Sequence, residues 1–232
     1  VSRKELDESG LPADRLWQPI TGRWFSAVFG LCLLYAVLRY HIAGDVEWGH
    51  FALFILNKAV ALAAVFLIAA SYLIGPVIRW LNRDPRRLVV IKFCGLMGFS
   101  LAAIHAFMAV LLMRPAYFGK FFLADGRMNS TGELAMTLGV LGLWAVSLPA
   151  IATLPMMPKA IGGVRWKRNQ RMGYLCLVLV LGHLVVMGWK GWISPETWPW
   201  GLPPISLWAS IGCVVPLMAK IRRSRPQDSP EA

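Results

Sequence analysis

Two histidines inside apolar stretches are the residues of this sequence best suited to chemistry. His105 lies nine residues before Arg114, and His183 lies seven residues before Lys190. At a helical rise of ~1.5 Å per residue, each imidazole is expected roughly 10–14 Å from the polar end of its helix. If the two helices run in the same direction, both imidazoles lie at one depth.

Imidazoles at matched depth favour a metal cofactor. An ionisable side chain among apolar residues is costly and is commonly functional. Neutral imidazole is a strong ligand for haem iron, and two imidazoles fill both axial positions, which suits electron transfer. The other interpretation is that each histidine only hydrogen-bonds a neighbouring helix. Small residues beside the histidines would let a flat macrocycle approach: Ala102, Ala106, Gly182 and Gly188.

The elements that must position these histidines are membrane-spanning helices. The chain has 232 residues, of which 57% are hydrophobic and only 16% charged, unlike an average soluble domain. A helix needs roughly 20 apolar residues to cross a bilayer, and inside lipid its backbone must satisfy its own hydrogen bonds. The sequence therefore predicts an all-α, six-helix integral membrane bundle. The apolar stretches are 24–43, 51–76, 89–113, 133–155, 172–189 and 203–219.

Basic residues predict the orientation of the bundle. Eighteen of the 24 Lys and Arg residues lie in or near the two tails, the connection around 79–92 and the connection around 159–171. The positive-inside rule makes these segments cytoplasmic, so both termini are expected there, in a bacterial inner membrane. We divide the chain into a tail (1–23), a transmembrane haem-binding domain (24–219) and a second tail (220–232).

Composition also excludes two kinds of site. The net charge of +12 is divided among separate cytoplasmic segments, so it does not indicate a folded basic domain that binds nucleic acid. The four cysteines lie in different apolar stretches without CxxC spacing, so we expect small buried residues rather than a metal or redox centre. They are Cys32, Cys94, Cys176 and Cys213.

Several polar residues near the outer ends of the helices are further candidates. Lys58 lies inside the second apolar stretch, where its ammonium either extends to the boundary or pairs with a haem propionate. Arg39 and Arg114 are alternative partners for a propionate. His41 and His50 flank the first outer connection and are expected to be solvated, with a quinone contact, a propionate contact or a second haem as the other interpretations.

Parts of the sequence resemble the ferric-reductase-like transmembrane domains. RRLVVIKFCGLMGFSLAAIHAFMAVLL (86–112) is similar to the third helix of that family, where paired arginines precede a helix with a haem histidine. RWKRNQRMGYLCLVLVLGH (165–183) resembles the fifth helix, and STGELAMTLGVLGLWAVSLP (130–149) the fourth. NKAVALAAVFLIAAS (57–71) resembles the second more weakly. The similarity covers roughly 50–195 and is nearest to the haem-binding membrane subunit of the bacterial methionine-sulfoxide reductase system.

The resemblance implies roles for particular residues. It implies that His105 and His183 are the haem ligands, and it places Trp166 and Arg168 at cytoplasmic motif positions. Gln170 stands where the family pattern has a histidine. Family members that stack two haems carry histidines thirteen or fourteen residues apart, and glutamine is a poor iron ligand. The resemblance therefore implies one haem b per chain.

The cytoplasmic half would then need another electron carrier. A quinone or an FMN cofactor against Trp166, Arg168 and Gln170 is one interpretation, and a plain helix-start role for Gln170 is the other. Together these patterns favour an electron-transfer subunit of an oxidoreductase, which takes electrons from the quinone pool or a flavin donor to a redox protein at the outer face. The alternative is a non-catalytic membrane subunit of a larger respiratory or photosynthetic complex, with structural haem or none.

The orientation is testable directly. We expect a cytoplasm-specific reporter to be active when fused after Arg223, because that tail carries basic residues retained inside. A cysteine introduced beside Lys120 should react with a thiol reagent that cannot cross the membrane. A tail accessible only from the periplasm would reverse the orientation.

Overall fold

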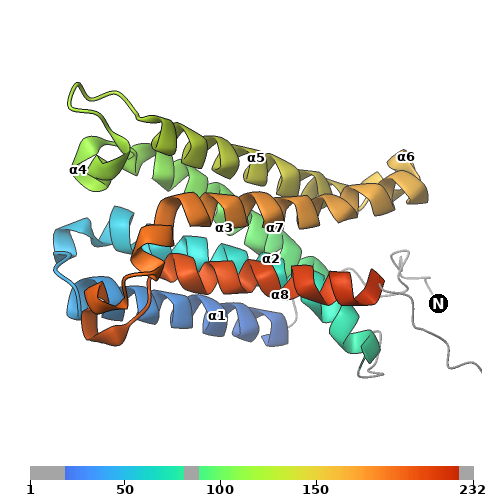
Figure 1. Ribbon diagram of the computed structural model, residues 1–232. Coiled ribbons are helices and arrows are strands. Elements are labelled where there is room, and N and C mark those ends of the chain that lie inside the picture. The colour runs from blue at the N-terminus through green and yellow to red at the C-terminus, as the bar shows by residue number, and fades with distance from the viewer. Residues whose placement is uncertain (1–18, 81–88, 225–232) are drawn as a thin grey trace, which may run out of the picture.

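The computed structural model describes residues 19–80 and 89–224 (Figure 1), and these residues are almost entirely helical. The six long helices are α1 (Pro19–Val37), α2 (Leu56–Trp80), α3 (Val89–Leu112), α5 (Ser130–Ala152), α7 (Gly163–Trp192) and α8 (Ile205–Ser224). The described part of the chain holds six helical spans long and apolar enough to cross a membrane. The prediction of an all-α six-helix bundle is confirmed.

Short helical turns complete the chain. The π-helical turn η2 (Leu38–Ile42) extends α1, while η3 (Trp48–His50) and η4 (Phe51–Ile55) lead into α2. The other short elements are α4 (Pro115–Phe118), η6 (Gly119–Phe121), α6 (Met157–Ile161), η7 (Pro195–Thr197) and η8 (Pro199–Gly201). The connection between α3 and α5 thus contains the one-turn helix α4 followed by the turn η6.

Helices α5 and α7, like α1, begin earlier than the apolar pattern indicated. Helix α7 starts at Gly163 rather than at 172, because the basic residues that precede its apolar part are themselves good helix formers. Helix α5 starts at Ser130, where the Asn129 side chain accepts a hydrogen bond from the Gly132 amide at 3.0 Å. This is an ordinary N-cap, which satisfies an amide that has no partner within the helix.

The outermost predicted segments lie beyond the part of the chain described. These are residues 1–18 and 225–232 of the two tails and residues 81–88 of the basic connection. Helix α1 begins at Pro19 and α8 ends at Ser224, so each helix extends five residues past the predicted domain boundary.

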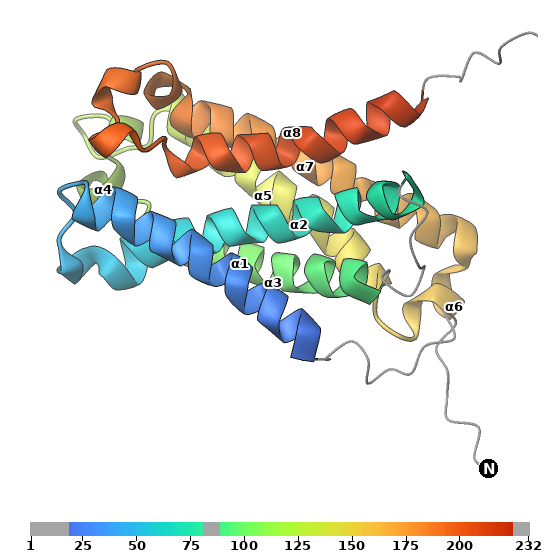
Figure 2. The ribbon, with the colours of Figure 1, turned by 90° about the horizontal axis from the view of Figure 1, so that it is seen from below.

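Helix α2 forms the centre of the bundle. In both views it lies among α1, α3 and α8 (Figures 1 and 2), and it packs against each of them. Half of its most apolar segment is buried, a larger share than in any other described span. Small buried residues such as Ala59, Ala63 and Ala64 allow the neighbouring helices to approach closely.

Helices α5 and α7 pack along each other and form the other side of the bundle. The connections 43–50, 113–129 and 193–204 gather at one end of the bundle, which we call the three-loop end (Figure 1). The short helix α6 and the beginning of α1 lie at the opposite end. The sequence predicts that the three-loop end faces the periplasm.

All four cysteines are buried, as expected for small core residues, and they form no disulfide with one another.

The contact between α2 and α3 supplies a test of the packing. A Cβ on Gly98 would lie 2.7 Å from Ile68 Cγ1 and 2.9 Å from the Ile68 backbone nitrogen, too close for a real contact. At Gly95, three residues earlier, the nearest Ser71 atoms would be 3.8 Å away, which is an ordinary contact.

We expect Gly98→Ala to be less stable than Gly95→Ala by ~1–3 kcal/mol, because only the first alanine forces two helices apart. Both variants gain the same helix propensity, so their difference isolates the packing effect. Chemical unfolding in detergent, followed by circular dichroism, measures it. Equal stability of the two variants would contradict this account of the α2–α3 contact.

Candidate functional site

A cavity of about 730 Å³ lies among α2, α3, α5, α7 and α8, towards the three-loop end. This volume is within the ~300–1,000 Å³ range typical of ligand and cofactor sites. Most of the lining is aliphatic or aromatic. The ionisable and amide side chains in the lining, beyond Tyr40 and Cys176, are Asn57, Lys58, His105, Lys120, His183 and Lys190.

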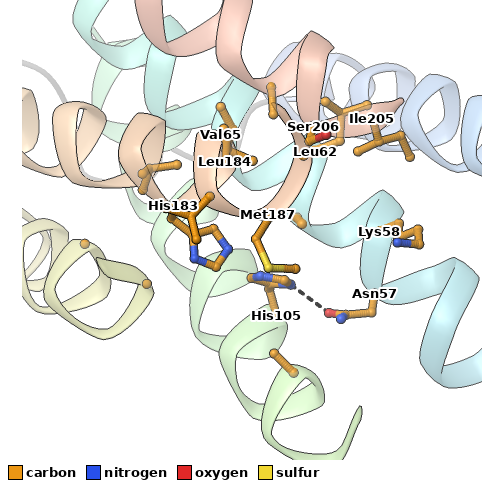
Figure 3. A pocket seen from close by; sticks show the side chains of 18 of the residues that line it. Asn57, Lys58, Leu62, Val65, His105, His183, Leu184, Met187, Ile205 and Ser206 are labelled. Atoms are coloured by element: carbon orange, nitrogen blue, oxygen red, sulfur yellow. Dashed lines mark hydrogen bonds between the residues drawn. The ribbon is translucent and has the colours of Figure 1, made fainter. Parts of the chain in front are cut away.

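Both predicted haem histidines line this cavity. His105 comes from α3 and His183 from α7, and their rings enter the same space (Figure 3). His105 Nδ1 lies 2.7 Å from the side-chain oxygen of Asn57 on α2. His183 Nδ1 lies 2.7 Å from the backbone carbonyl oxygen of Ala135 on α5. The structure thus brings together two imidazoles that are 78 residues apart in the sequence.

These hydrogen bonds decide which nitrogen of each ring carries the proton. A carbonyl or amide oxygen only accepts, so Nδ1 of each ring donates. In a neutral imidazole the proton is then absent from Nε2, whose lone pair can bind a metal. A hydrogen bond from the other nitrogen is the usual way in which proteins orient a metal-ligating histidine. The helix-to-helix hydrogen bonds and the ligand role are therefore compatible, because they use different nitrogens.

The donor set fits a haem better than a bare metal ion. A protein site for a bare transition metal usually needs three or four side-chain ligands. No group of three or more His, Cys, Asp or Glu side chains suitable for a metal occurs among the residues that the structure describes. A haem supplies four nitrogens itself and needs only two axial ligands, which His105 and His183 can provide.

Glycines on α5 let it approach the His183 ring. A Cβ on Gly139 would lie 3.2 Å from His183 Nδ1, and one on Gly142 would lie 3.1 Å from Val180 Cγ2. Any larger residue at Gly139 would press on the imidazole. This close approach brings the Ala135 carbonyl, one turn earlier on α5, within reach of the ring.

The small residues expected beside the histidines fall into two groups. Three of them line the cavity, and the fourth faces Leu138 of α5 instead. The lining residues are Ala102, Ala106 and Gly188, and the fourth is Gly182.

Lys58 lines the cavity beside Asn57, in a position consistent with its proposed pairing with a propionate. Its ammonium lies 4.3 Å from the centre of the Phe54 ring and 4.7 Å from that of Tyr40. Aromatic faces attract a cation but carry no net negative charge. The ammonium is therefore held at the cavity wall without being neutralised.

The two arginines proposed as further propionate partners do not line the cavity. Arg39 is buried, and its Nε donates to the Pro203 carbonyl at 2.9 Å, which ties the end of α1 to the start of α8. Arg114 is exposed, and its Nε donates to the Leu111 carbonyl at 3.1 Å. Their side chains support the helix ends rather than the cavity.

Trp166 and Gln170 bind the end of a neighbouring helix. Trp166 Nε1 donates to the Ala152 carbonyl at 3.0 Å, and Gln170 Nε2 donates to the Pro149 carbonyl at 3.3 Å. Carbonyls in the last turn of a helix lack intrahelical partners. The two side chains of α7 thus cap the end of α5, and Gln170 lies well inside α7 rather than at a helix start.

The other predicted site residues lie apart from the cavity. Arg168 is on the exposed side of α7. His41 Nδ1 lies 2.7 Å from the Val46 carbonyl oxygen and its ring packs on Trp48, whereas His50 is exposed. The structure therefore does not bring these histidines to the two that share the cavity.

Three polar residues that line the cavity were not predicted as site residues from the sequence: Asn57, Lys120 and Lys190. Asn57 had a visible signal, since it is an amide within an apolar stretch and precedes Lys58. Lys120 and Lys190 had none, because lysines at the ends of membrane helices are usually solvated. The folding of the outer connection over the cavity gives Lys120 its place in the lining, whereas Lys190 reaches the lining from the last turns of α7.

No known protein-family model matches the chain.

Substitution of Trp166 tests whether this residue caps α5 or contacts an electron carrier such as a quinone or a flavin. We expect Trp166→Phe to lower the free energy of unfolding by ~0.5–1.5 kcal/mol, because the indole hydrogen bond is lost. Trp144→Phe, at an exposed tryptophan of α5, is the control and should change stability little. If Trp166→Phe instead left stability intact and abolished electron entry, a quinone or flavin contact would be the better explanation.

Proposed function

We propose that this chain is a membrane haem b protein that passes electrons from quinol or a flavin donor to a partner at the outer face of a bacterial inner membrane. The observation that carries the proposal is the pair of Nδ1-anchored imidazoles on α3 and α7 in one apolar cavity. A bound haem supplies an iron that accepts and releases one electron at a time.

The residues of this chain would do three things for such a group. The two histidines would hold the iron from separate helices, each ring fixed by its Nδ1 hydrogen bond. The apolar lining would exclude water, and the glycines of α5 would keep the ring of His183 in place. With both His105 and His183 holding the iron, the group would supply electron transfer rather than binding of oxygen.

The partner would meet the protein at the three-loop end, where the cavity lies. The α3–α5 connection there is folded, with a bridge between Phe122 and Met128 and an ion pair of 2.7 Å between Asp125 and Arg127. Leu123 is half exposed on this connection. Because this connection is folded and lies at the end of the bundle where the cavity is, we propose it as the docking surface for a periplasmic redox protein.

Haem content provides the first test. We expect one haem per chain, because only one pair of imidazoles shares a cavity among the described residues. The dithionite-reduced protein should show the spectrum of six-coordinate haem b, and the pyridine haemochrome assay against protein mass should give a ratio near one. A ratio near two would point to ligands outside this cavity, with His41 and His50 examined first.

The ligand assignment is tested by His105→Ala and His183→Ala. Each variant should lose most of its haem, because the iron would lose an axial bond and its tether to one helix. His50→Ala, at an exposed histidine, is the matched control and should retain haem. Normal haem content in both cavity variants would refute the assignment. A correctly folded wild-type protein without colour would favour the non-catalytic subunit of a larger complex.

A further inference from the structure

The cavity has a positively charged rim. Lys58 of α2, Lys120 of η6 and Lys190 of α7 all contribute to the lining, and no Asp or Glu side chain lines it within the described ranges. The rest of the lining is mostly apolar, including Val146 and Cys176 on the side away from the three-loop end. Such a cavity suits a flat apolar molecule with anionic groups along one edge.

Lys120 is brought to the rim by the fold of the outer connection. Phe121 is fully buried and anchors this connection against the helices. The Asn129 side chain donates to the Lys120 carbonyl at 3.0 Å, and the Lys120 ammonium donates to the Met187 carbonyl of α7 at 2.6 Å. Met187 is one helical turn beyond His183, so the ammonium sits about 6 Å nearer the three-loop end than that histidine.

Lys120 lies close enough to Lys58 and Lys190 to be affected by their positive charges. The pKa of the Lys120 ammonium is lowered from its ordinary value, first by partial desolvation and then by the positive charges of Lys58 and Lys190. Like charges gathered without a neutralising carboxylate repel each other. An anion placed among them would remove that repulsion.

We propose that Lys58, Lys120 and Lys190 bind the two carboxylates of the cofactor, which then lies with its carboxylate edge towards the three-loop end. This inference rests on the proposed haem function and adds to it the orientation of the cofactor and two residues, Lys120 and Lys190. It assigns the carboxylates to these lysines instead of Arg39 and Arg114, because neither arginine lines the cavity. The apolar edge of the ring would face Val146 and Cys176.

A pair of ligands that differ only in the carboxylates tests the inference. Haem-free full-length protein in detergent is titrated with haemin and with haemin dimethyl ester, and binding is followed by the Soret band of six-coordinate haem. We expect wild-type protein to bind the diacid at least roughly tenfold more tightly than the diester, because charge-assisted hydrogen bonds form only with the diacid.

The corresponding protein variant is the triple substitution Lys58→Gln, Lys120→Gln and Lys190→Gln. It should lose that preference by binding the diacid more weakly and the diester as before. Arg114→Gln removes an exposed positive charge near the same end without touching the cavity, and it should keep the preference. Circular dichroism and unchanged diester binding show that the triple variant remains folded.

The possible results separate this inference from the proposed function. Equal binding of diacid and diester by wild-type protein, with six-coordinate spectra, would overturn the lysine assignment while leaving the histidine ligands supported. If the triple variant kept its preference for the diacid and Arg114→Gln lost it, the carboxylates would be assigned to Arg114 instead. Binding of neither ligand would overturn the haem proposal and this inference with it.

Discussion

The site depends on one constraint: an imidazole buried among apolar side chains must find an acceptor for its N–H. Here each Nδ1 finds an oxygen on a neighbouring helix, Asn57 for His105 and the Ala135 carbonyl for His183. Because these bonds use Nδ1, both Nε2 atoms remain the groups available for a ligand. The positions of α2 and α5 relative to α3 and α7 therefore decide which nitrogen of each imidazole is available for a ligand.

Close helix packing makes these hydrogen bonds possible. Gly98 allows α3 to lie against α2, and Gly139 allows α5 to lie against the His183 ring. Trp166 and Gln170 of α7 hold the other end of α5 by binding its last carbonyls. The same α5–α7 pair is thus fixed at one end by capping and near the other by a histidine, which leaves the space between them and α2 for the cavity.

The cavity is also polarised along the bundle. Its lysines lie towards the three-loop end and its apolar wall lies deeper. This arrangement agrees with a cofactor that is apolar over most of its surface and anionic along one edge. Under the proposed function, electrons would leave near the same end, because the cofactor would lie beneath the folded α3–α5 connection.

The sequence by itself determined that the helices suit a lipid environment, that the fold is all-α and that two histidines lie at a similar depth. Long apolar stretches require helices in lipid, and the similar distances of His105 and His183 from polar helix ends, nine and seven residues, predicted that they lie at about one depth. These inferences succeed because depth in a helix follows from counting residues. The tertiary structure alone decided which side chains face one another. It gave Nδ1 of His183 a backbone carbonyl, turned Arg39 to a carbonyl and Trp166 to the end of α5, and brought Lys120 to the rim. Every residue has a backbone carbonyl, so the sequence does not show which one will accept a hydrogen bond. In a folded connection the side chains are positioned by tertiary contacts and not by helical periodicity, so their places cannot be counted from the sequence.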